Sequence, residues 1–184
     1  MKNCFILVCL VLLLSPAFAW AGQSKERVLV AYFSATGRTR AVAEQIAKEC
    51  GADIFEITPS VPYLDADLNY NDKNSRCVKE HNNPKLRPEI AKKIPALAKY
   101  DRIFIGYPIW WGEAPNIVYT FLEAHDFSGK QLVPFCTSHS SPLGKSDVKL
   151  HAFAPKAIWH GGKCFDISYK KADVSAWLLN LKKK

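Results

Sequence analysis

The 184-residue sequence lacks the common local signatures of nucleotide, metal and hydrolase sites. It contains neither G-x-G-x-x-G nor the complete P-loop pattern, which argues against a Rossmann dinucleotide site and a nucleoside triphosphatase. It has no C-x-x-C pair, and its five histidines lack ligand spacing, so no metal site is predicted. Without a G-x-S-x-G elbow or a triad that spacing could assemble, a hydrolase is also disfavoured.

Glycine and proline are too sparse, at 9 and 11 residues, for a collagen-like or low-complexity chain. The chain is 48% apolar and 23% charged, which suits one globular domain. Its net charge of +8 is uneven, because residues 130–184 carry ten basic and three acidic side chains, a net of +7. Residues 41–129 have a net charge of −3. Since the basic residues are spread over several elements and no nucleic-acid motif occurs, no nucleic-acid partner is expected.

The first 21 residues have the order of a secretory signal peptide. Lys2 precedes an apolar run over residues 5–14, and small residues at 17–21 provide a cleavage pattern. Ten apolar residues are about half of what a membrane-spanning helix needs. We therefore predict a leader over residues 1–21, a mature domain over residues 22–184, no stable membrane insertion after cleavage, and a periplasmic or secreted location.

Cleavage leaves four cysteines, Cys50, Cys77, Cys136 and Cys164, in a compartment that permits disulfides. Three pairings into two disulfides are possible, and four separately packed thiols are an equally open alternative. The sequence does not choose between these arrangements.

Strand and helix patterns alternate along the mature chain. Strands are predicted over residues 28–33, 53–57, 102–107, 131–136 and 164–168, and helices over 39–50, 115–123 and 173–181. Residues 58–87 are polar and without clear periodicity, and we interpret them as a surface insertion that can fold over a site. A further helix is predicted from Pro88, interrupted at Pro95. This order predicts an α/β fold in three layers, a doubly wound five-stranded parallel sheet with helices on both faces.

In such a sheet ligands bind beyond the carboxyl ends of the strands, so the loops after the first, third and fourth strands are the candidate site. After the first strand, residues 34–39 read Ser-Ala-Thr-Gly-Arg-Thr and lead directly into a helix. Hydroxyls, backbone N–H groups at a helix start and a glycine that permits close approach are suited to a phosphate. The alternative is that Thr36 only caps the helix.

After the third strand, residues 107–115 read Tyr-Pro-Ile-Trp-Trp-Gly-Glu-Ala-Pro. Two adjacent tryptophans at a ligand edge are not both expected to face the core, and an exposed indole face can stack on a flat heteroaromatic ligand. The alternative is one tryptophan in the core and one exposed without a function.

Together these two loops resemble the flavodoxin family, and the resemblance extends over most of residues 27–181. It implies strand order 2-1-3-4-5 and a non-covalently bound flavin mononucleotide (FMN) at the switch point. The residues that match the family's phosphate loop are Ser34, Thr36, Gly37, Arg38 and Thr39. Those that match the loop covering the isoalloxazine ring are Pro108, Ile109, Trp110, Trp111 and Gly112, with Trp110 or Trp111 stacked on the ring.

The third loop departs from the pattern of related flavodoxins, Thr-Ser-Gly-Gly-Ser-Gly-Ile-Gly. Thr137 and Ser138 are retained as cofactor-binding residues, but His139, Ser140 and Pro142 replace glycines. Proline fixes φ and offers no N–H, so the loop cannot follow the family path unchanged. Either the pyrimidine edge of the flavin is held differently, with His139 as a donor, or the affinity has fallen. A solvent-facing His139 is the simpler alternative.

The resemblance implies electron transfer through bound FMN, here outside the cytoplasm. Two alternatives remain: an NAD(P)H-dependent reductase of quinones or other small acceptors, and a flavodoxin-like binding module that has lost FMN. Because flavodoxins are usually acidic and this chain is basic, we expect an acidic redox partner protein and a reduced flavin that is less strongly reducing.

Overall fold

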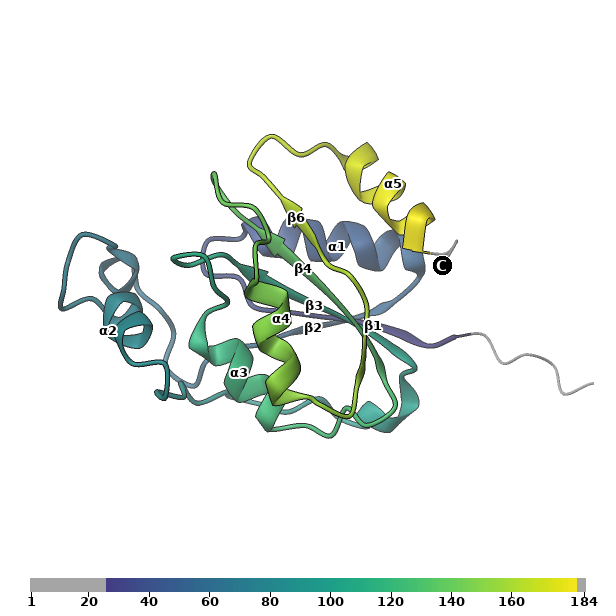
Figure 1. Cartoon of the computed structure of the whole chain (residues 1–184), viewed down its shortest axis with the longest axis horizontal. Coiled ribbons are helices and arrows are strands. Elements are labelled where there is room, and N and C mark those ends of the chain that lie inside the picture. Colours follow the sequence, from purple (N-terminus) through teal and green to yellow (C-terminus); the bar gives the residue numbers. More distant parts are fainter. Residues whose placement is uncertain (1–25, 182–184) are drawn as a thin grey trace, which may run out of the picture.

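The computed structural model describes residues 26–181, so the predicted leader at residues 1–21 lies outside the described residues. The sheet is parallel throughout, in the order β2-β1-β3-β4-β5, and β6 also pairs with β4 (Figure 1). Its strands are β1 (Val28–Tyr32), β2 (Asp53–Glu56), β3 (Arg102–Pro108), β4 (Gln131–Thr137), β5 (Ile158–Trp159) and β6 (Lys163–Phe165). The predicted doubly wound fold and the strand order implied by the resemblance are confirmed.

Helices cover both faces of the sheet and make it the middle of three layers (Figure 1). On one face lie α1 (Arg38–Cys50) and α5 (Lys171–Leu181), and on the other α3 (Asn116–Glu123) and α4 (Ser146–Leu150). A fifth helix, α2 (Arg76–Asn82), stands to the side, beyond the strand ends. Three short 3₁₀ turns are η1 (Asp65–Leu68), η2 (Leu97–Lys99) and η3 (His151–Phe153).

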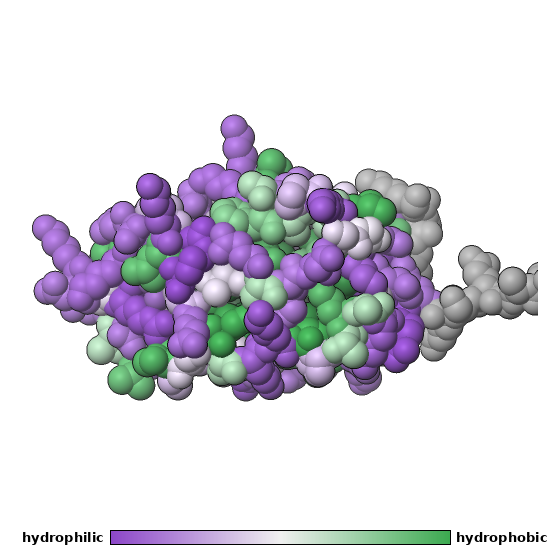
Figure 2. All heavy atoms as spheres, turned by 90° about the horizontal axis from the view of Figure 1, so that it is seen from below, coloured by the Kyte–Doolittle hydropathy of each residue, from purple (hydrophilic) through white to green (hydrophobic). Residues whose placement is uncertain are grey.

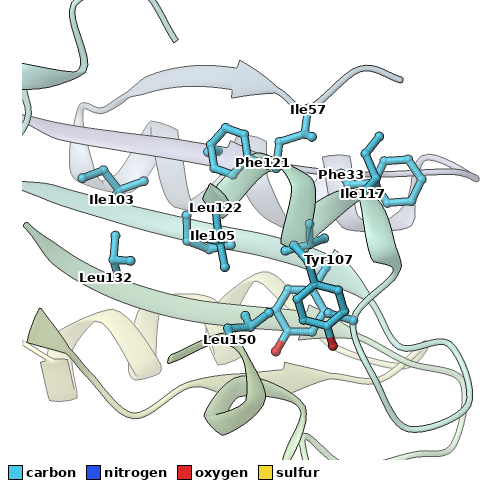
Figure 3. Close-up of a cluster of buried hydrophobic side chains, with 14 of the residues drawn as sticks. Phe33, Ile57, Ile103, Ile105, Tyr107, Ile117, Phe121, Leu122, Leu132 and Leu150 are labelled. Carbon is cyan, nitrogen blue, oxygen red and sulfur yellow. The ribbon is translucent and has the colours of Figure 1, made fainter. Parts of the chain in front are cut away.

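The central strands β1, β3 and β4 are buried on both faces because each face packs against helices. On β3, Ile103, Ile105 and Tyr107 point to the α3 side and pack with residues such as Phe121 (Figure 3). Phe104, between them, belongs to the separate core under α1 and α5. The alternation of period two therefore divides one strand between two cores.

The strand order reverses between β1 and β3, where the chain has gone to β2 on one side and returns on the other. The neighbouring strand β4 packs very tightly against this point. A Cβ atom on Gly106 of β3 would lie 2.2 Å from the ring of Phe135, its register partner on β4. Hydrogen alone fits here, so this glycine fixes the packing of the central strands below the loops.

Two predicted elements are wrong and two helices, α2 and α4, were missed. No helix starts at Pro88. This stretch is extended, with a bridge between Pro59 and Ile90, because a proline disfavours helical backbone at the residue that precedes it. The sheet ends in two short strands, β5, which was not predicted, and β6, which overlaps only the start of the predicted fifth strand, 164–168. Its end is taken by a turn in which the Asp166 carboxylate accepts the backbone N–H of Ser168. The missed helices are short, with seven residues in α2 and five in α4, too few for a clear helical period.

Hydrophilic side chains cover most of the face seen from below in Figure 2, with hydrophobic ones between them. Within residues 26–181 no helix is long and apolar enough to cross a membrane. In the same range, no group of three or more His, Cys, Asp or Glu side chains is placed to hold a metal ion.

Candidate functional site

The loops after β1, β3 and β4 meet at one rim of the sheet around a cavity of about 400 Å³. A volume of this size is within the range of small-molecule sites. The predicted site residues that line it are Thr36, Arg38, Thr39, Pro108, Ile109, Trp110, Thr137, Ser138 and His139. Four others, Ser34, Gly37, Trp111 and Gly112, belong to the same loops but do not line it. The hydroxyl-rich and aromatic loops are thus brought to one site.

The hydroxyl-rich loop after β1 ends at the start of α1. Gly37 is the N-cap residue and has φ = 84°, a left-handed conformation that glycine adopts without strain. No side chain caps the helix, so the interpretation of Thr36 as an ordinary cap is wrong. The Ser34 Oγ atom is buried and has no hydrogen-bond partner within the part of the chain that the structure describes. An uncapped helix start beside an unsatisfied hydroxyl is an arrangement suited to an anion.

A buried hydrogen bond joins this loop to the end of β4. The Oγ1 atoms of Thr39 and Thr137 lie 2.8 Å apart, and both side chains are nearly inaccessible to solvent. Beside them, the backbone N–H of Ile109 donates to the Thr137 carbonyl at 2.9 Å. The threonine pair therefore fixes two walls of the cavity relative to each other.

The charge around the cavity favours an anionic ligand. Arg38 is the one permanently charged side chain among the described residues that line it, and none of those residues is a carboxylate. The neighbouring Arg40 is already paired with Glu56, at 2.6 Å, and does not line the cavity. A negative ligand at the helix start would meet the helix dipole and one free guanidinium without a nearby lining carboxylate to oppose it.

The aromatic loop after β3 is a tight hairpin. The backbones of Trp110 and Glu113 exchange both hydrogen bonds, at 2.9 and 3.0 Å. Between them Trp111 and Gly112 have φ = 47° and 82°, the signs that a type I′ turn requires. Because successive residues of this turn point apart, the two tryptophans have different environments.

Trp110 is buried, with 6% of its surface exposed, whereas Trp111 is 40% exposed. The Trp110 ring contacts the rings of Phe33 and Tyr63 edge to face, at centroid distances of 5.9 and 5.6 Å. Trp111 stacks on His81 at 4.5 Å and does not line the cavity. The expectation that the two would not both face the core is confirmed, and the ring available to the cavity is that of Trp110.

The insertion at residues 58–87 packs against Trp110 through Tyr63 and Tyr70. Glu80 of α2 accepts hydrogen bonds from Tyr63 Oη and Arg76 Nε, at 2.7 and 2.8 Å. The Arg76 guanidinium also lies 3.9 Å from the centre of the Tyr63 ring. Burial raises the pKa of Glu80, although both hydrogen bonds oppose that shift. Burial also raises the pKa of Tyr70, at the cavity edge, to about 12.

The loop after β4 reaches the cavity despite its missing glycines. The N–H of Ser138 donates to the Phe165 carbonyl at 3.0 Å, which prolongs the pairing with β6. The Ser138 Oγ then accepts the N–H of Ser141 at 2.8 Å and closes a turn. The exposed side chain of His139 lines the cavity, while Pro142 lies outside its lining.

The cavity also has walls that the sequence analysis did not assign: Ala35, Leu68, Tyr70, Ser140, Ser141 and Ile167. Leu68 and Tyr70 come from the insertion, which was expected to fold over a site but offered no pattern to single them out. Ile167 was placed inside a strand, and the turn that carries it has no local signature.

Comparison with known proteins identifies the family. A sequence model of the flavodoxin family matches residues 27–181. A crystal structure from Bacteroides eggerthii, described as a putative flavoprotein, is 43% identical, with a TM-score of 0.80 over 86% of this chain and 99% of its own. One from Bacteroides uniformis is 40% identical, with a TM-score of 0.80 over 84% of this chain and 98% of its own.

A flavoprotein of Lactobacillus acidophilus, solved in complex with FMN, is 23% identical. It has a TM-score of 0.62 and covers 83% of this chain and 99% of its own, a likeness of fold. A search of the curated proteins found no match. Since the family model covers nearly all of the described chain, this protein belongs to the flavodoxin family.

Proposed function

We propose that the cavity binds FMN non-covalently and that the protein transfers electrons through it. The observation that carries this proposal is the uncapped start of α1 at the cavity, together with the nearby Ser34 hydroxyl, which lies outside the cavity lining, is buried and has no hydrogen-bond partner among residues 26–181. A phosphate monoester would satisfy both at once. The family match and the FMN complex of the Lactobacillus flavoprotein support the same ligand.

Different residues of the cavity would contact different parts of FMN. Ser34, Thr36 and Thr39, with the backbone of the α1 start, would hold the phosphate, and Arg38 would neutralise part of its charge. Trp110, Ile109 and Tyr70 would contact the ring system and exclude water from it. His139 and the serines at 138, 140 and 141 line the cavity and would meet the polar edge of the ring. Bound FMN supplies one-electron and two-electron chemistry, which a protein tunes by burial and charge.

The proposal extends to location and partner. The secretory pattern of residues 1–21 supports action outside the cytoplasm. The basic residues at 130–184 and the absence of carboxylates from the described cavity lining support an acidic partner protein and a less strongly reducing cofactor. A potentiometric titration that gave a potential as low as in acidic flavodoxins would contradict this part.

The test of FMN binding compares two ligands on one variant. Ser34→Ala removes a single hydroxyl, and a hydrogen bond to a charged group contributes about 1.5–3 kcal/mol. We expect FMN affinity to fall about ten- to a hundredfold, while the affinity for riboflavin, which lacks the phosphate, stays unchanged. Fluorescence quenching of either flavin on titration with protein measures both affinities.

Ser60→Ala, an exposed serine of the insertion, is the matched control and should change neither affinity. Equal affinities of the wild-type protein for FMN and riboflavin would show that the hydroxyl-rich loop does not bind the phosphate. If neither flavin binds, the chain is a flavodoxin-like module that has lost its cofactor.

A further inference from the structure

Two cysteines lie side by side on neighbouring parallel strands. Cys136 of β4 and Cys164 of β6 are register partners, and both side chains are on the α3 and α4 side of the sheet. Adjacent strands are about 4.8 Å apart, and a disulfide needs Cα atoms about 4.4–6.8 Å apart. A bond between these two sulfurs therefore requires little movement of the backbone.

The two thiols have different chemistry. The Cys136 thiol donates a hydrogen bond to the sulfur of Cys164, and this bond together with burial raises the pKa of Cys136. The same hydrogen bond lowers the pKa of Cys164, because it stabilises the thiolate there. Cys164 is thus the better nucleophile of the pair.

Cys164 is also the more accessible of the two thiols. Cys136 is fully buried, whereas Cys164 is partly exposed and lines an open cavity of about 440 Å³ beside the loop at residues 139–142. The Cys164 thiol donates a hydrogen bond to the Ser141 carbonyl, with Sγ and O 3.5 Å apart, and both residues line that cavity. Cys77, by contrast, is fully buried, and its Sγ lies 3.5 Å from the Ser75 hydroxyl.

From this geometry we propose that Cys136 and Cys164 form a thiol–disulfide exchange site that reacts with disulfides of small molecules such as glutathione. The Cys164 thiolate attacks one sulfur of the external disulfide, forms a mixed disulfide and releases the first thiolate, which takes up a proton. Cys136 then loses its proton and attacks the Cys164 sulfur, forming the Cys136–Cys164 bond and releasing the second thiol. The protein dithiol is oxidised by two electrons and one external disulfide is reduced to two thiols.

The cavity beside Cys164 shares residues 139–141 with the proposed FMN cavity, so the experiment uses the purified protein without added flavin, in which bound ligand cannot cover the thiol. The fully reduced protein is equilibrated anaerobically with mixtures of reduced and oxidised glutathione, alkylated, and digested with trypsin without reduction. The two cysteines fall in separate tryptic peptides, residues 131–145 and 164–170. We expect these peptides to become linked in one cooperative transition, and to separate again in excess reduced glutathione.

Variants test the order of attack. In Cys136→Ser the Cys164 thiol should accumulate as a glutathione adduct, since no resolving thiol remains. In Cys164→Ser the buried Cys136 should stay reduced. Cys50→Ser, a cysteine of α1 on the other side of the sheet, should leave the linkage unchanged.

Peptide mapping of the wild-type protein decides the matter even if a serine variant folds poorly. Both thiols remaining reduced at every glutathione ratio would overturn the proposal. So would a linkage of Cys164 to Cys50 or Cys77, or a lasting glutathione adduct on Cys164 in the wild-type protein.

Discussion

The two sides of the cavity differ in how far their side chains are already satisfied by the protein. On the hydroxyl-rich side, Ser34 has no hydrogen-bond partner and no side chain caps α1. On the aromatic side, Trp110 is packed by other rings, and Trp111 stacks on His81. The hydroxyl-rich side has polar groups whose hydrogen bonds a ligand would supply, whereas the aromatic side is packed by the protein's own rings without a ligand.

This difference separates two tasks of a ligand site. Unsatisfied buried polar groups cost free energy, so the hydroxyl-rich side gains the most from an anion and is suited to supply affinity. The aromatic side is stabilised by the fold itself, so it supplies shape and a dry wall at little cost when the ligand arrives. Substitutions on the aromatic side should therefore mainly lower the stability of the fold. Substitutions on the hydroxyl-rich side should weaken ligand binding or break the hydrogen bond between Thr39 and Thr137.

The largest effect is expected for the buried tryptophan. Trp110→Ala removes a ring that is 6% exposed, and such truncations cost about 3–5 kcal/mol of unfolding free energy. Trp111→Ala removes a partly exposed ring that contacts His81 and Tyr70, so we expect a smaller loss of about 1 kcal/mol. Urea denaturation followed by far-UV circular dichroism compares them. Equal losses would show that the exposed ring supports the insertion as much as the buried one does.

The same contrast explains what could be predicted from the sequence. Strands such as 28–33 and 131–136 were recognisable because burial on both faces leaves a continuous apolar run. The hydroxyl-rich loop was recognisable because its residues act locally, next to a helix start. Their meeting at one rim follows from the parallel order of the strands.

The aromatic side could not be read in the same way because its partners come from a distant, irregular segment. Nothing local marks Tyr63 or Tyr70 as neighbours of Trp110, since the insertion at 58–87 has no period and is held by long-range contacts to the site. The split of the last strand was missed for a similar reason. Glycines at 161–162 and the turn at Asp166 interrupt the pairing with β4, and neither changes the apolar pattern.

The next largest effect is expected at the hydrogen bond between Thr39 and Thr137, which links the helix start to the end of β4. Thr39→Val removes one partner of a buried hydroxyl pair and leaves the other unsatisfied, which costs about 1–3 kcal/mol. Thr137→Val should cost a similar amount. The double variant should lose less than the sum of the two, because no buried hydroxyl is then left alone. Additive losses in a urea double-mutant cycle would mean that the two hydroxyls do not depend on each other.

A smaller effect, dependent on pH, is expected at Glu80. Its pKa is raised by burial, so the protonated form is favoured in the fold; that stabilisation is complete below about pH 4 and is lost as pH rises through the raised pKa. Glu80→Gln removes the titration and keeps an acceptor for Arg76, which also donates to the Val61 carbonyl at 2.6 Å. We expect the variant to match the wild type near pH 4 and to exceed it at pH 7, by less than the Thr39→Val loss. A wild-type advantage at pH 7 would mean that the pair with Arg76 outweighs burial.

The smallest effect tests the hydroxyl-rich side by charge alone. Arg38 is exposed and lines the cavity, so Arg38→Gln should weaken FMN binding by about 0.3–1 kcal/mol, roughly two- to fivefold, at low salt. At about 1 M salt the screening length falls to about 3 Å, and the difference should disappear. Arg40→Gln is the matched control, because that guanidinium is held by Glu56 and does not line the cavity. An equal loss in both variants would assign the effect to the general charge of the surface, and the contrast between the two sides of the cavity would then rest on the Ser34 hydroxyl and the helix start alone.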